Sequence, residues 1–226
     1  MSILGIESCN KDKCLTGNEY RVGVNREVEN FTEIDVKLSA VIELIKDSTP
    51  YIEFVVEGNL EQYIATPVID SVLTISLSDC FKEHQNIVIK VHYDTLHTIT
   101  ISGPGDVKSS QIMEQDSMNL HIKSTGDIAL TSNIKNLYTV INGTGNVTIN
   151  GQIENHTVEI NNSGGVGTYQ AMTQTATINS TGSGNMYLRV KNSITGSLTN
   201  SGNIYYKRNP IVNVVVSGTG KVIDDN

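Results

Sequence analysis

Two acidic side chains have the type and spacing that a glycoside hydrolase requires. Asp106 and Asp127 each follow a glycine directly and lie 21 residues apart. If this interval is one coil of stacked strands, their carboxylates lie about 5 Å apart, a separation that suits a retaining glycosidase. The next equivalent positions are Asn146 and Gly165, and Asp and Asn are favoured at such corners because their side chains bond the local backbone. We therefore predict a structural role for both aspartates, no catalytic residues and no enzyme activity.

A metal or cofactor site has less support. His92 and His97, with Asp94 between them, are the nearest approach to a ligand cluster, and this spacing is more typical of an exposed turn. No combination of cysteine and histidine has the spacing of a zinc site. We predict neither a metal nor a cofactor.

The three cysteines raise separate questions. Cys14 and Cys80 can form a disulfide in an oxidising compartment, which would add about 2–4 kcal/mol; the alternative is two free thiols. Cys9 follows a short apolar stretch and a serine and precedes polar residues, like the lipid attachment site of bacterial lipoproteins, although Glu7 fits that pattern poorly. In that case a hydrophobic segment lies upstream of this sequence. The alternative is a plain disordered tail.

Composition divides the chain into regions. Residues 1–100 carry the whole net charge of −8, whereas residues 101–226 are balanced and hold most of the glycine. We predict a flexible N-terminal tether over residues 1–19, a β-rich region over 20–100, and a regular repeat over 101–226. The negative charge disfavours nucleic acid, and no apolar run is long enough to cross a membrane, so a lipid anchor would be the sole link to one.

The regular repeat is the clearest pattern in the sequence. A glycine recurs at steps of 18 to 21 residues, with an apolar residue two positions after it and, in six of seven cases, four positions before it. Apolar residues therefore alternate on both sides of a small-residue corner, which is a strand pattern. The glycine serves either a positive φ or a close approach between coils. These predicted corner residues are Gly105, Gly126, Gly145, Gly164, Gly184, Gly202 and Gly220.

A period of about 19 residues indicates a solenoid, because one coil cannot bury its apolar face but a stack can. We predict an all-β fold, a single-stranded right-handed parallel β-helix of the pectin-lyase-like kind, since parallel crossovers are right-handed. Residues 20–100 would be its divergent, acidic start and would cap the N-terminal end. A separate β-sandwich in that region is the alternative.

One outward face of the predicted solenoid is a candidate for binding. Residues three positions before successive corner glycines are polar and should point out of one sheet, and we expect two tyrosines three positions after corners to point outward as well. This candidate binding face comprises Asn142, Asn161, Thr181, Thr199 and Ser217, with Tyr187 and Tyr205. The alternative is a structural surface, because a solvated sheet needs polar outer residues and stacked Asn and Thr support neighbouring coils.

Several segments resemble the GIN-domain group, the head domain of putative autotransporter adhesins. The resemblance covers roughly residues 20–223 and is most specific at the end of the chain. It is carried by the repeat units Ser124–Leu130 and Gly143–Ile149, the endings Ser201–Pro210 and Val216–Val222, and the earlier segments Arg26–Val36, Leu60–Ile64 and Val72–Ser76. Departures from the family pattern are Met186, the pair Gly164-Gly165, and Cys14 and Cys80.

The resemblance implies a non-enzymatic β-helix exported to the envelope of Gram-negative bacteria, often Bacteroidetes, with a role in adhesion and no assigned catalytic residues. We therefore expect a lipid-anchored protein of the cell surface or periplasm that binds a glycan or protein ligand. A self-associating structural envelope protein, present as a homo-oligomer, is one alternative. A β-helix that binds or degrades polysaccharide is another.

Overall fold

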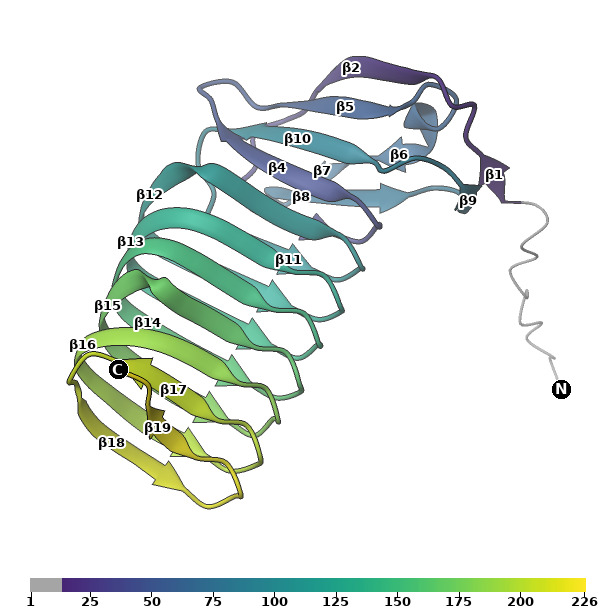
Figure 1. Ribbon diagram of the computed structural model, residues 1–226. Helices are drawn as coiled ribbons and strands as arrows, with labels where there is room; N and C mark the ends of the chain where they lie inside the picture. The colour runs from purple at the N-terminus through teal and green to yellow at the C-terminus, as the bar shows by residue number, and fades with distance from the viewer. Residues whose placement is uncertain (1–13) are drawn as a thin grey trace, which may run out of the picture.

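The computed structural model describes residues 14–226, so the predicted lipid attachment site Cys9 lies outside the described residues. The described chain is a stack of β-coils that begins at an irregular β region and ends at an open coil (Figure 1). No α-helix occurs between residues 14 and 226, and a single 3₁₀ turn, η2, interrupts the strands. None of these described elements is a helix that could cross a membrane.

The strands occupy most of the described chain. Those of the N-terminal region are β1 (Leu15–Thr16), β2 (Arg21–Glu27), β3 (Glu33–Val36), β4 (Val41–Lys46), β5 (Tyr51–Glu57), β6 (Ile64–Ala65), β7 (Val68–Ile69), β8 (Val72–Leu77), β9 (Phe81–Glu83) and β10 (Val88–Tyr93), with η2 at Glu61–Tyr63. Those of the regular stack are β11 (Thr98–Ile101), β12 (Asp106–Ile122), β13 (Ile128–Ile141), β14 (Val147–Ile160), β15 (Val166–Ser180), β16 (Met186–Leu198), β17 (Ile204–Lys207), β18 (Ile211–Val216) and β19 (Val222–Asp224).

Each long strand from β12 to β16 bends once and so contributes to both walls of the solenoid. The start of β12 pairs with β4, while its end pairs with β11. Successive coils pair in parallel and in register, as β13 and β14 do from Ile128 opposite Val147 to Ile141 opposite Ile160. The register shifts fall near the bends, which absorb the extra residues that make the glycine steps unequal. The predicted parallel β-solenoid is confirmed.

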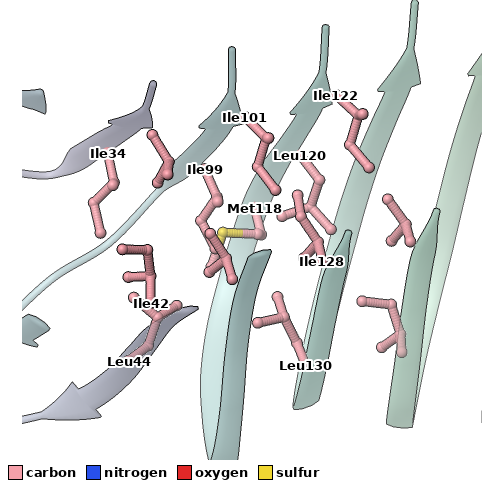
Figure 2. Close-up of a cluster of buried hydrophobic side chains, with 14 of the residues drawn as sticks. Ile34, Ile42, Leu44, Ile99, Ile101, Met118, Leu120, Ile122, Ile128 and Leu130 are labelled. Atoms are coloured by element: carbon pink, nitrogen blue, oxygen red, sulfur yellow. The ribbon is translucent and has the colours of Figure 1, made fainter. Parts of the chain in front are cut away.

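The core is built from the alternating apolar residues of both walls. Ile101, Ile122, Ile141 and Ile160 stack in one buried column, each with no exposed surface. Figure 2 shows the same arrangement nearer the N-terminal end, where side chains from the two walls, such as Ile99 and Ile128, point into one interior. Because a fully buried isoleucine contributes about 1.5–3 kcal/mol, these columns are the main stabilisation of the stack.

The corner glycines allow neighbouring coils to approach closely. A Cβ on Gly145 would lie 2.0 Å from the carbonyl oxygen of Gly126, and one on Gly126 would lie 2.0 Å from that of Gly105. Among the glycines of residues 14–226, positive φ values occur instead at Gly151 and Gly196, which the repeat pattern did not single out. Of the two roles that the sequence left open, close approach is therefore the one that the corners require.

The coils of the N-terminal region are stacked out of sequence order. The coil β3–β4 lies between the coil β8–β10 and the coil β11–β12, because β3 pairs in parallel with both β8 and β11. On the other wall β4 likewise pairs in parallel with both β10 and β12. The chain therefore builds the second coil of the stack before the first. These strands share one continuous sheet with the later coils.

Antiparallel strands close this end of the stack. β5 pairs antiparallel with β10, and β2 pairs antiparallel with β5; β6 and β7 pair antiparallel with β8. Arg26 on β2 lies over the ring of Phe54, 4.5 Å from its centroid, and donates to the backbone carbonyl of Ile64 at 2.6 Å. The outer edge strand β2 carries charged residues, which discourage further strand pairing.

A disulfide joins Cys14 to Cys80 and holds β1 beside β9. The two residues are 66 positions apart, and closing a loop of this length contributes about 4 kcal/mol in the chain-entropy model. The backbone N–H of Glu19 also donates to the buried Glu57 carboxylate at 2.6 Å. The expectation of a flexible tether as far as residue 19 is therefore corrected for residues 14–19, which the disulfide and these hydrogen bonds attach to the body.

Gly145→Ala will destabilise the fold, because the added Cβ meets the carbonyl oxygen of Gly126 in the neighbouring coil. We expect a loss of about 2–3 kcal/mol in the free energy of unfolding, measured by guanidinium denaturation. The matched control is Gly23→Ala on the outer strand β2, where an added Cβ meets nothing within 4 Å. Equal stability of the two variants would contradict the role assigned to the corner.

Candidate binding surface

The corner residues Asp106 and Asp127 belong to a ladder that runs along the solenoid. The Oδ1 atom of Asp106 accepts the backbone N–H of Asp127 at 2.9 Å, and that of Asp127 accepts the N–H of Asn146 at 2.6 Å. Asn146 repeats the pattern with the N–H of Gly165 at 3.0 Å. Each side chain thus bonds the next coil, which is a structural use of the carboxylates rather than an acid–base pair.

Much of the predicted binding face is hydrogen-bonded to itself. The Nδ2 atom of Asn161 donates to Oδ1 of Asn142 at 2.8 Å, and the hydroxyl of Thr181 donates to Oδ1 of Asn161 at 3.1 Å. The hydroxyl of Thr199 donates to the backbone carbonyl of Ser180, and Ser217 is exposed on the last coil. These contacts favour the structural alternative for this face, because its polar groups already have partners.

The two predicted tyrosines stand on neighbouring coils. Tyr187 pairs in register with Tyr205, and their rings stack 5.0 Å apart at an angle of 8°. Tyr169 lies edge-on to Tyr187, with 5.6 Å between the ring centroids. The Nζ atom of Lys207 lies 4.8 Å from the centroid of the Tyr169 ring. Sequence reasoning missed Tyr169, although its position five residues after a corner glycine places it on the same outward face as Gly167.

Tyr169 is locked in its neutral form. Its hydroxyl donates to the Asp225 carboxylate at 2.7 Å. Burial, together with the hydrogen bond to Asp225, raises the pKa of the Tyr169 phenol above its ordinary value. The hydrogen bond to Asp225 and the edge-on contact with Tyr187 therefore fix the position of the Tyr169 ring in the cluster.

A polar groove of about 650 Å³ crosses the bends of β12 to β15. Its charged and amide side chains include Glu114, Asp116, Lys135, Glu154, Gln152 and Gln174. The Lys135 ammonium bonds the Asp116 carboxylate and lowers the pKa of that carboxyl below its ordinary value. The groove lies at bends without a glycine motif, which is why the repeat pattern did not point to it.

The sequence predicted an exposed turn at His92 and His97, and this prediction is wrong for His92. His92 lies on strand β10 with 7% of its surface exposed, stacked on Tyr51 at 3.8 Å, with Nδ1 3.2 Å from the Asp47 carboxylate. His92 lies between the core residues Val91 and Tyr93, so it points to the outer face of the strand, where the ring of Tyr51 covers it. His97 stays exposed and lines the polar groove. Among residues 14–226, no three His, Cys, Asp or Glu side chains are grouped as metal ligands.

His156 is a titratable group inside the core. It is buried, and its Nε2 atom lies 3.0 Å from the hydroxyl of Thr139, while its Nδ1 atom has no partner among the described residues. Burial lowers the pKa of His156 to about 3. Protonation would put an N–H where the described residues offer no acceptor, so the imidazole is a neutral core side chain.

Comparison with known proteins places the chain in a family. Residues 30–210 match the family model described as "Putative auto-transporter adhesin, head GIN domain". The chain belongs to this GIN-domain family. The match includes the out-of-order N-terminal coils and the regular stack, so the GIN domain as defined by the family spans most of the solenoid. A search of curated proteins finds no match.

Solved structures share the fold of this GIN domain. A putative adhesin from Bacteroides fragilis aligns with a TM-score of 0.86 at 20% identity, covering 92% of this chain and 98% of that one. One from Parabacteroides distasonis aligns at 0.69 and 19% identity, covering 92% and 98%. A putative lipid binding protein from the same species aligns at 0.69 and 18% identity, covering 94% and 100%. At these identities the likeness shows the fold alone.

The buried imidazole of His156 will make stability depend on pH. Its folded pKa of about 3 lies below the unfolded value near 6.5, so the unfolded chain binds the proton more readily. The contribution of His156 to the free energy of unfolding is complete above pH 6.5 and is lost as the pH falls toward 3. Between pH 7.5 and 5 the loss is about 2 kcal/mol.

Denaturant unfolding at several pH values will test this. Between pH 7.5 and 5, the free energy of unfolding of His156→Gln should fall by about 2 kcal/mol less than that of the native chain. The control His84→Gln, at an exposed histidine, should show the same pH dependence as the native chain. An identical pH dependence for all three proteins would contradict the assignment of a buried neutral imidazole.

Proposed function

We propose that this GIN domain is an exported, non-enzymatic adhesion module that binds a ligand at the cell surface. The observation that carries the proposal is a rigid stack whose polar outer surface, with its groove of about 650 Å³ across successive coils, is available to an extended ligand. Membership of the adhesin family supports the same role. The corner carboxylates, which bond the backbone of the next coil, do not support hydrolysis of a bound glycan.

The disulfide supports export. Disulfides persist mainly in oxidising compartments such as the periplasm and the cell surface, and Cys14 bonds Cys80. We propose that Cys9 carries the lipid anchor, since it precedes the attached segment by few residues and would leave a short link between membrane and stack. Side chains such as Ile141 and Ile160 fill the interior of the stack, so we propose no lipid-binding site there.

Intact producing cells will show surface exposure. We expect external protease to remove the protein and antibodies to bind it, because an adhesion module must reach its ligand outside the outer membrane. The measurement is loss of the protein from washed cells, with a periplasmic protein as the marker of intact envelopes.

A Cys9→Ala variant separates anchoring from exposure, since it should leave the membrane fraction while keeping the fold. Protection of the native protein until the outer membrane is broken would rule out direct adhesion and favour a structural role inside the envelope.

A second candidate function, self-association as an envelope component, is favoured by the C-terminal end of the stack. Strand β18 is the last strand on its wall of the solenoid, and it pairs with β16 on one side only. Its side chains Ile211 and Val215 are 76% and 66% exposed. The strand has no charged residue between Ile211 and Val216, and charges are the usual protection of an edge. Two copies can pair β18 antiparallel about a two-fold axis without like charges meeting.

Sedimentation over a wide concentration range tests this second function. We expect a monomer–dimer equilibrium for the native chain and a shift to monomer for Val215→Lys, because the variant places a charge on each of the two paired edges. Ile112→Lys, at an exposed apolar residue on the bend of β12, is the control and should dimerise normally. A native chain that stays monomeric at the highest concentration excludes the dimer.

A further inference from the structure

One coil of the solenoid lacks side chains at two neighbouring outward positions. Gly165 and Gly167 occupy columns that hold Asn146 and Thr148 in the coil before and Asn185 and Tyr187 in the coil after. The result is a concavity of about 340 Å³, the Gly167 notch, whose walls include Thr148, Ser163, Asn185 and Tyr187.

The glycine at 167 is not required by the fold. A Cβ there would have only the Thr148 hydroxyl within 4 Å, at 3.8 Å, whereas a Cβ on the corner Gly164 would lie 2.1 Å from the carbonyl oxygen of Gly145. Corner glycines remove a clash, but Gly167 leaves an open space. The missing side chain therefore creates room on the surface rather than allowing coils to stack.

The notch also interrupts the corner ladder. At the other steps the side chain of one coil accepts the backbone N–H of the next, as Asn185 does for Asn203 and Asn203 for Lys221, both at 2.9 Å. Gly165 has no side chain, and the described residues supply no acceptor for the N–H of Asn185. By equivalence with the other coils, this donor points to the place where the side chain of residue 165 would lie.

An aromatic wall borders the same space. Tyr187 is 42% exposed, and Tyr205 stacks parallel on one face of its ring. Gly167 is the register partner of Tyr187 on the side opposite Tyr205, and Tyr187 lines the notch. Contacts with Tyr205 and Tyr169 hold the ring in place, which reduces the entropy lost when a ligand stacks on it.

The chemistry of the lining selects a neutral, hydroxyl-rich ligand. It combines an aromatic face, the hydroxyls of Thr148 and Ser163 and a free backbone N–H, and none of its residues is charged. The volume lies at the small end of the range for ligand sites. An aromatic face packs against the C–H surface of a pyranose, while the polar groups bond its hydroxyls; a phosphate or carboxylate would find no cation in this lining.

We propose that the Gly167 notch binds one uncharged sugar unit of a glycan, stacked on Tyr187 and hydrogen-bonded by the backbone N–H of Asn185. This inference rests on the adhesion function proposed above and gives the chemical class of the ligand. It also places binding on the coil where the repeat is broken, rather than on the self-bonded face of Asn142 and Asn161.

The test measures binding of the full chain to an array of uncharged oligosaccharides ending in galactose, N-acetylglucosamine, mannose or fucose, with sialylated and sulfated forms beside them. We expect binding to a subset of the uncharged glycans. Gly167→Val fills the notch and Tyr187→Ala removes its wall, and each should weaken that binding at least tenfold. Gly23→Val, at an open site on β2, is the matched control, and unfolding midpoints of all variants confirm that they fold.

The outcomes separate this inference from the proposed function. Loss of binding in both notch variants, with retention in Gly23→Val, supports the notch. Retention in Gly167→Val and Tyr187→Ala, binding of charged glycans alone, or no glycan binding by a chain that is exposed on intact cells overturns the notch and leaves adhesion through another surface. Notch-dependent binding by a chain protected inside the envelope keeps the notch and removes the adhesion role.

Discussion

The close contact between backbones at the glycine corner is the constraint on which the whole structure depends. Parallel strands of neighbouring coils must lie about 4.8 Å apart to form their hydrogen bonds, and the corner brings the carbonyl of Gly126 to within 2.0 Å of where a Cβ of Gly145 would be. A side chain there would push the coils apart along both walls. The buried isoleucine columns and the Asp and Asn ladders rest on this spacing, because both consist of contacts between equivalent residues one coil apart.

A solenoid leaves a row of unpaired backbone groups at each end, and this chain treats its two ends differently. At the N-terminal end the direction of the strands reverses, and antiparallel β2 and β5 cover the outermost parallel coil under a charged edge. The disulfide between Cys14 and Cys80 fastens the segment that enters this cap. At the C-terminal end β18 presents apolar side chains on an uncharged edge, so this end is the part of the described surface best suited to pair with another strand.

The regular outer surface is largely occupied with holding the stack together. Asn142, Asn161 and Thr181 bond one another, and the corner side chains bond the backbone of the next coil. Groups left for a ligand therefore concentrate where the repeat is interrupted: at the bends that form the polar groove, and at the coil where Gly165 and Gly167 replace larger residues. In a repeat protein of this kind, departures from the repeat are more informative about binding than the repeat itself.

The sequence by itself determined the fold class, because alternation around a recurring glycine depends only on local strand geometry and on burial of one face. It identified the column that runs from Ile101 to Ile160, the corners, and the structural use of Asp106 and Asp127. The order of the first coils was decided by tertiary structure, because β3 accepts a parallel partner equally well on either edge and nothing local selects β8 or β11. The same holds for whether Cys14 and Cys80 are bonded or free, for the burial of His92 and for the space above Gly167. Each depends on which strand or coil lies beside the residue, and that adjacency exists only once the chain has stacked.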